Sequence, residues 1–159
     1  METAAFAAFG AVCMRLMTPE RQTIRTSSTN SGSRRGLSRM LPSSSGIIRL
    51  VNGIVLGAIT TATTGAEKLW AGTVVIHPNA KTGAHHHGPV ESVIYVVSGR
   101  ARMKWGDRLE FTAEAGPGDF IYVPPYVPHQ EINASPSEVL ECVLVRSDGQ
   151  AVAVNLDIA

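Results

Sequence analysis

The residues best suited to chemistry are histidines and one glutamate in two parts of the chain. His85, His86 and His87 are consecutive, Glu91 follows after three further residues, and His129 comes much later. Imidazole nitrogens and carboxylate oxygens are the usual protein ligands of first-row metals. In an extended segment residues i and i+2 point to the same side, so His85 and His87 can bind one ion while His86 points elsewhere. Glu91 could reach back to that ion, and His129 would have to come from a neighbouring strand.

Short strands must position these residues. From Ile47 onward, runs rich in apolar and β-branched residues alternate with Gly, Asn and Pro. Arg100–Trp105 alternates with period 2, which predicts that Ala101, Met103 and Trp105 face inward. No segment predicts a long helix, and this spacing favours an all-β sandwich or barrel. The expected strands are 47–50, 54–61, 69–77, 90–97, 100–105, 108–113, 120–123, 127–132 and 139–145.

Two gapped motifs then give a family resemblance. The segment Gly83 to Gly99, with its His-x-His and Glu91, resembles the first cupin motif. The segment Gly118-x5-Pro124-x-Tyr126-x2-His129-x3-Asn133 resembles the second. With its flanking strands the resemblance covers roughly residues 47–146. It implies an all-β double-stranded β-helix, the cupin or jelly-roll barrel. It also implies one divalent transition metal (Fe, Mn, Zn or Ni) bound by His85, His87, Glu91 and His129.

The chain departs from the motifs at two positions. Seven residues separate Glu91 from Gly99, where the family usually has six, so the regular register would place Ser92 at the ligand position. A slip of one residue turns a strand side chain to the opposite face. Either a bulge re-aims Glu91, or three histidines and water hold the ion. Tyr126 replaces the glycine of the second motif, and its ring could cap the pocket mouth.

Residues 1–46 differ in composition from residues 47–159, the expected cupin domain. The leader has six arginines and two glutamates, a balance of 6 − 2 = +4, and is rich in Ser and Thr. We expect disorder, and the composition also resembles a transit peptide. Alternatively, Met40 is the true start. The expected location is cytoplasmic, or an organelle if the leader targets one.

Charge and hydropathy exclude some partners. The domain has 8 basic and 11 acidic residues, a balance of −3, with no basic stripe for nucleic acid. No apolar run approaches the length of a membrane span. Cys13 and Cys142 lie far apart and predict neither a disulfide framework nor a zinc site. The apolar strands at Ile47–Thr61 would leave an exposed edge, which favours a homodimer.

A metal with open coordination positions supports three functions. The first is a metal-dependent oxygenase acting on a small oxygenated organic molecule. The second is an isomerase, epimerase or decarboxylase of a small sugar or acid, with Arg100, Arg102 and Lys104 as an anion-binding edge. The third is a non-catalytic ligand-binding or sensory module. Glu131, two residues after His129, could be an inner acid or base, although a supporting or surface role is favoured.

Overall fold

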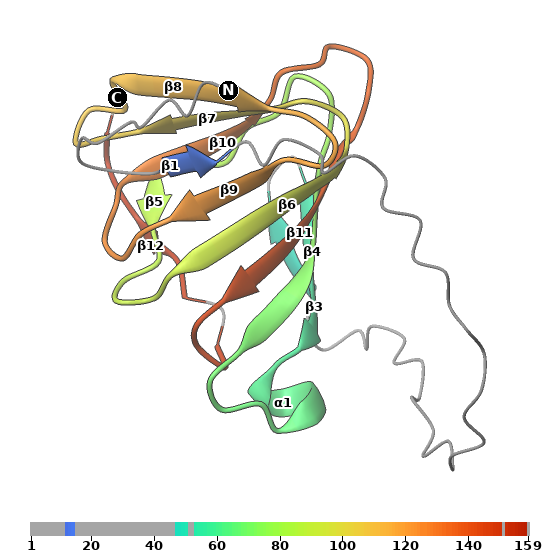
Figure 1. Ribbon diagram of the computed structural model, residues 1–159, viewed down its shortest axis with the longest axis vertical. Helices are drawn as coiled ribbons and strands as arrows, with labels where there is room; N and C mark the ends of the chain where they lie inside the picture. The colour runs from blue at the N-terminus through green and yellow to red at the C-terminus, as the bar shows by residue number, and fades with distance from the viewer. Residues whose placement is uncertain (1–11, 15–46, 51–52, 151, 159) are drawn as a thin grey trace, which may run out of the picture.

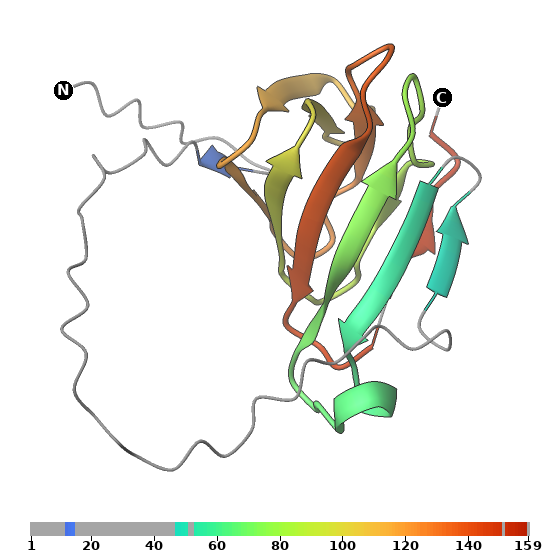
Figure 2. The same ribbon diagram turned by 90° about the vertical axis from the view of Figure 1, so that its right-hand side faces the viewer.

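A computed structural model describes residues 12–14, 47–50, 53–150 and 152–158, and these form two antiparallel sheets (Figure 1). The larger sheet has seven strands in the order β1-β9-β6-β11-β4-β3-β2. The long strands lie side by side in one layer in both views (Figure 2). Their bounds are β1 Val12–Met14, β2 Ile47–Leu50, β3 Gly53–Ile59, β4 Trp70–Ile76, β6 Ser92–Ser98, β9 Phe120–Val123 and β11 Leu140–Arg146.

The smaller sheet has five strands in the order β12-β5-β10-β7-β8. Its strands are β5 His85–His86, β7 Ala101–Trp105, β8 Phe111–Ala115, β10 His129–Asn133 and β12 Val154–Asn155. A helix of four residues, α1 Thr61–Thr64, follows β3 and is the only α-helix among the described residues. No helix in the described part of the chain has the length and hydropathy needed to cross a membrane.

The core lies between the sheets and follows the alternation of the strands. In β11 every second residue is buried, and β6 shows the same pattern from its first residue. Ala101 and Met103 are buried as predicted, and Trp105 packs against the core. The other face of the large sheet exposes apolar side chains, including Val93, Val97 and Phe120. Phe120 and its ring partner Tyr95 lie together on this outer face.

Turns connect the two sheets and fix the strand ends. Gly99, between β6 and β7, has a φ of 86°, and a Cβ there would lie 2.5 Å from the Val139 carbonyl oxygen. Only glycine fits such a position without strain. The buried Asn133 amide donates hydrogen bonds to the Ile76 and Glu138 carbonyls, at 3.0 and 2.8 Å. These bonds fix the connection between β10 and β11, and thereby the register of the strand that carries His129.

The predicted all-β cupin barrel is confirmed, with each expected strand present within a few residues of its predicted ends. Three strands were not anticipated, namely β1, β5 and β12. β1 belongs to the leader for which disorder is predicted, yet it pairs with β9 from Val12↔Tyr122 to Met14↔Phe120. Since β9 would otherwise be an edge strand, its free backbone groups explain the added strand. The rest of the leader prediction lies outside the described residues.

Candidate metal centre

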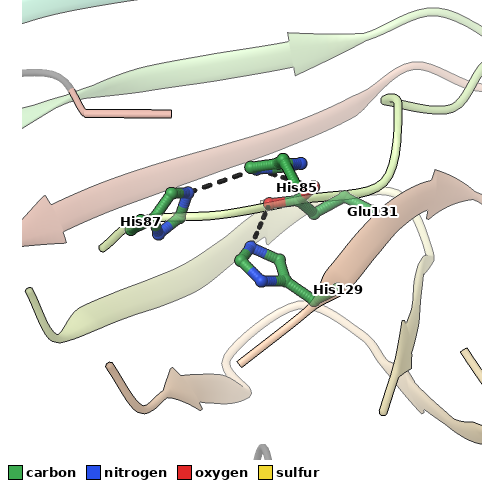
Figure 3. Close-up of side chains that lie close together, drawn as sticks. All are labelled: His85, His87, His129 and Glu131. Atoms are coloured by element: carbon green, nitrogen blue, oxygen red, sulfur yellow. Dashed lines mark hydrogen bonds and ion pairs between the residues drawn. The ribbon is translucent and has the colours of Figure 1, made fainter. Parts of the chain in front are cut away.

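Three histidines meet inside the barrel on adjacent strands of the smaller sheet. His85 on β5 is directly opposite His129 on β10, and His87 follows β5. All three are buried, with 8%, 2% and 0% of the surface of His85, His87 and His129 exposed. Their ring centroids lie 4.4 to 5.0 Å apart. The structure therefore brings together the three histidines that the motifs single out (Figure 3).

Each ring is oriented through its Nδ1 atom. His85 Nδ1 lies 2.9 Å from the Gly83 carbonyl oxygen and His129 Nδ1 lies 2.8 Å from that of Val127. Carbonyl oxygens only accept hydrogen bonds, so both Nδ1 atoms donate, and in the neutral rings both Nε2 atoms keep their lone pairs. This is the arrangement that protein ligands use to fix the tautomer of a metal-binding histidine.

His87 has the same tautomer for a different reason. Its Nε2 lies 2.9 Å from a guanidinium nitrogen of Arg146, which can only donate. A neutral ring must then have its proton on Nδ1, where it donates to Ser92 Oγ at 2.7 Å. Burial, followed by the charge of Arg146, lowers the pKa of His87 to about 2. His87 is therefore neutral at physiological pH, and its Nε2 lone pair accepts the hydrogen bond from Arg146.

The Nε2 atoms of the three rings point toward one another without a proton between them. Those of His85 and His87 are 3.2 Å apart, and neither can donate when both Nδ1 atoms do. His129 Nε2 is fully buried and has no hydrogen-bond partner among the described residues. Converging lone pairs repel one another unless a cation lies between them. The donor set therefore fits a divalent metal ion.

Glu131 adds a carboxylate from the same strand as His129. Residues two apart on a strand share a face, and the Glu131 oxygens lie 3.8 Å from His85 Nε2 and 3.6 Å from His129 Nε2. Thr82 Oγ1 donates a 2.7 Å hydrogen bond to this carboxylate. Possible ligand atoms of His85, His87, His129 and Glu131 all lie within 4.8 Å of one another. These four residues form the metal-binding group, and Glu131 occupies a more central place than the sequence favoured.

Burial and neighbouring charges keep this group in its metal-binding protonation state. Burial alone would raise the pKa of Glu131. The opposing influence of His85 and His129, together with the hydrogen bond from Thr82, lowers it to about 2. Burial lowers the pKa of His129. At neutral pH the group therefore offers the Glu131 carboxylate and the neutral imidazoles of His87 and His129.

The structure does not bring Glu91 to the histidines. Its side chain is exposed and accepts a 2.5 Å hydrogen bond from the Tyr122 hydroxyl. Ser92, the next residue, begins β6 and is fully buried against His87. No bulge re-aims Glu91, so strand alternation turns it outward and Ser92 inward. The structure therefore places Glu91 apart from the three histidines, and the carboxylate that lies beside them is that of Glu131.

Arg146 is the residue that sequence reasoning missed. It ends β11, is only 7% exposed, and its guanidinium lies 5.4 Å from the centroid of the buried Trp70 ring. Trp70 and Ser92 are its direct cross-strand neighbours. The alternation Leu140, Cys142, Leu144, Arg146 places all four on the inward face. That pattern was available in the sequence, and it marks a charged residue that faces the core.

Other predicted residues surround this group or lie away from it. His86 accepts a hydrogen bond from the Gly88 amide, consistent with a supporting role. His77 is exposed in a loop between β4 and β5. Tyr126 keeps the left-handed backbone of the motif glycine, with a φ of 59°, but its side chain is 62% exposed. Arg102 forms an exposed ion pair with Glu114, which removes it from the predicted anion-binding edge.

A cavity of about 120 Å³ adjoins the metal-binding group. A dry cavity of roughly 150 Å³ holds benzene in another protein, so this space suits a molecule of about six non-hydrogen atoms. Its polar lining includes groups from both sheets. The residues that line it are Val55, Val74, Thr82, Gly83, His85, Glu131, Leu144, Arg146, Ala153 and Asn155.

Comparisons with known proteins agree with this geometry. The cupin domain family matches residues 72–146. Solved structures of oxalate decarboxylase from Bacillus subtilis, one at pH 4.6 and one studied for its Mn(II) centres, are 26% identical to this chain with a TM-score of 0.62. The alignment covers 69% of this chain but only 29% of those chains. No curated protein sequence gives a significant match. The chain therefore contains a cupin domain, and residues 72–146 are the span that matches this family.

Proposed function

We propose that this cupin is a metal-dependent enzyme acting on a small oxygenated organic molecule. The observation that carries the proposal is the convergence of His85, His87, His129 and Glu131 within 4.8 Å, beside a cavity of about 120 Å³. Four protein ligands leave one or two positions open on an ion that prefers five or six. When bound, the metal supplies a Lewis acid and a site for O₂ or for a substrate oxygen.

Two reactions suit such a centre. The first is O₂-dependent oxidation, for which open positions beside three histidines and a carboxylate are the supporting feature. The second is decarboxylation. The similarity to oxalate decarboxylases and the buried cation of Arg146 favour it. For hydrogen oxalate the products balance as one formate and one CO₂. The chain spans less than a third of the length of those decarboxylases, so their activity enters here as a proposal.

The protein's own residues have separate roles in this proposal. Gly83, Val127 and Ser92 orient the three rings through Nδ1, and Thr82 orients Glu131. Apolar side chains of Val55, Val74 and Leu144 exclude water from one side of the cavity. Exclusion of water strengthens electrostatic interactions at the bound substrate.

The experiment compares the metals and the two reactions directly. Metal content is measured on protein purified without added metal, and the protein is then loaded with Mn(II) or Fe(II). O₂ uptake and CO₂ release are followed with oxalate and with a panel of catechols, diketones and thiols. CO₂ and formate without net O₂ uptake favour the decarboxylase, and O₂ uptake favours the oxygenase. Stoichiometric metal with neither product would leave the ligand-binding module as the better description.

The predicted homodimer also stays a proposal. β3 and β6 expose Ile54, Ile59, Val93 and Val97 on the large sheet, and exposed apolar patches mark association surfaces. Light scattering of the purified protein tests this prediction, and a monomeric mass across micromolar concentrations contradicts it.

A further inference from the structure

Arg146 presents a buried cation at the metal-binding group. Its side chain is in an interior position, and one guanidinium nitrogen, Nη2, lies 2.9 Å from His87 Nε2. The neighbouring Nε is fully buried and has no hydrogen-bond partner among the described residues. A buried guanidinium with an unsatisfied N–H is costly unless a partner is supplied. The only carboxylate in the metal-binding group, Glu131, has no hydrogen bond to Arg146 in this part of the structure.

The unsatisfied edge has the geometry that binds carboxylates. Nε and Nη2 lie along one side of the planar guanidinium and carry parallel N–H bonds. Arg102 uses the same two atoms on the protein surface, where both donate to Glu114 at 3.0 and 2.6 Å. Arg102 thus has a carboxylate on this edge of its guanidinium. The same edge of the buried Arg146 has no carboxylate, and its Nη2 lies against the lone pair of His87 Nε2.

That lone pair cannot be shared. His87 Nε2 has a single electron pair, so it either accepts from Arg146 or binds a metal ion. Coordination of the metal by His87 would release Nη2, and two N–H donors would then lie beside the metal-binding group. The buried Trp70 ring packs against the guanidinium and limits its movement.

Charge balance favours the binding of an anion between Arg146 and the metal-binding group. Arg146 and Glu131 offset each other, and histidines that bind a metal ion are neutral. A divalent ion therefore adds two positive charges to a buried site. A neutral molecule would leave both uncompensated, whereas a carboxylate or dicarboxylate offsets one or both.

We propose that Arg146 is the anchor for the carboxylate of a small organic acid, which binds through Nε and Nη2 while another of its oxygens faces the metal. This inference rests on the proposed metal-dependent function and names its substrate class. The cavity of about 120 Å³ limits the acid to a few carbon atoms. Oxalate and glycolate are suitable probes because each joins a carboxylate to a second oxygen function on the adjacent carbon.

The test measures binding rather than turnover. The full chain is loaded with Zn(II), which has no redox chemistry, and titrated calorimetrically with oxalate and with glycolate, and metal retention is checked after each titration. Arg146→Met should raise the Kd of both acids roughly 10- to 100-fold, as expected for a lost hydrogen-bonded charge. Arg146→Lys keeps the charge but loses the two parallel N–H groups of the guanidinium, and should give a smaller rise in Kd. The matched control Arg102→Met should bind like the wild type.

Metal affinity separates an anchor from a merely structural arginine. Zn(II) should bind Arg146→Met as tightly as the wild type or more tightly, because the guanidinium no longer occupies the His87 lone pair. A weaker Zn(II) site, or unchanged binding of oxalate and glycolate, would overturn the inference. If Arg146→Met does not fold, wild-type acid affinity in Arg146→Lys overturns it. A wild-type protein that binds no metal would instead contradict the proposed function itself.

Discussion

Glu91 and Glu131 each lie close in sequence to metal-binding histidines, yet they have opposite environments. Glu91 precedes β6, is exposed, and its carboxylate is bonded to Tyr122 on the outer face of the large sheet. Glu131 lies on β10 with its carboxylate beside His85 and His129, held by Thr82. The difference arises from parity along the strand: Glu131 is two residues from His129, whereas Glu91 is one residue from the inward-facing Ser92.

Three imidazoles and one carboxylate thus lie together, although the carboxylate belongs to another strand than the motif resemblance implies. The inward position at the start of β6 is filled by Ser92, which hydrogen-bonds His87 instead of offering a charge. The negative charge beside the histidines belongs to Glu131 on the smaller sheet, where it shares a face of β10 with His129. The donor set remains three imidazoles and one carboxylate. Variants at these positions test whether Glu131 takes the place that the motifs imply for Glu91.

The largest loss of metal affinity is expected when one of the three histidines common to the predicted and the observed group is removed. His129→Ala removes a fully buried donor and should lower metal affinity by at least about 1,000-fold, since no other described side chain can replace it. His77→Ala, an exposed histidine in a loop, is the matched control. Both are measured by calorimetric titration with Zn(II), with circular dichroism to confirm folding. Stoichiometric, tight binding in His129→Ala would contradict the proposed centre.

The two glutamates give the most direct test. Glu131→Gln keeps the shape but removes the charge, and we expect metal affinity to fall about 100-fold or more. Glu91→Gln should leave it within about twofold, because its carboxylate bonds Tyr122 at the surface. The same titration serves for both variants. Equal losses in the two, or a loss in Glu91→Gln alone, would restore the sequence-based assignment of Glu91.

Much of this architecture could be predicted from the sequence because strand period and turn residues are local properties. Alternation placed Ala101 and Met103 inside, and the spacing of His85 and His87 placed both on one side of the chain. β5 and β12 have only two residues each, and such short strands form by pairing with a neighbour rather than from their own sequence. β1 likewise depends on the edge of β9.

The site was harder to predict where residues distant in sequence cooperate. The three histidines followed from motif spacing, but the choice between Glu91 and Glu131 required the register of β6 against its neighbours. Ser92 was the position that regular register favoured, and the structure places it there as a hydrogen-bond partner of His87. Arg146 could have been found from the alternation of β11, but its approach to His87, 59 residues away, depends on how the strands pair.

Substitution of Ser92 tests whether the inward-facing side chain at the start of β6 contributes to metal affinity. Ser92→Ala removes the acceptor of the His87 Nδ1 proton and loosens the ring, so metal affinity should fall roughly 10-fold, at the lower end of what supporting residues contribute. Ser98→Ala is a matched control at the far end of β6, where the hydroxyl bonds an exposed Glu141. Unchanged affinity in Ser92→Ala would mean that packing alone orients His87.

Acid should destabilise the buried group in the metal-free protein. The pKa of His87 is lowered to about 2 by burial, against about 6.5 when unfolded, so the unfolded chain binds the extra proton below pH 6.5. Its contribution to stability is complete above pH 6.5 and falls by up to about 1.4 kcal/mol per pH unit below it. Glu131 adds to this loss below its ordinary pKa of 4.5. Urea unfolding between pH 7 and 4 measures the slope, which His87→Gln should reduce; an unchanged slope would contradict a neutral His87.

The smallest effect is expected at the surface pair. Tyr122→Phe removes the hydrogen bond to Glu91, and the free energy of unfolding should change by no more than about 0.5 kcal/mol, because water can replace the lost partner of an exposed carboxylate. The pKa of Tyr122 is raised by its hydrogen bond to Glu91. Glu91→Gln should therefore lower it toward the ordinary value, which ultraviolet titration measures. Metal affinity should be unchanged in Tyr122→Phe, and any loss there would link the outer face of β9 to the centre, against the separation of Glu91 from Glu131.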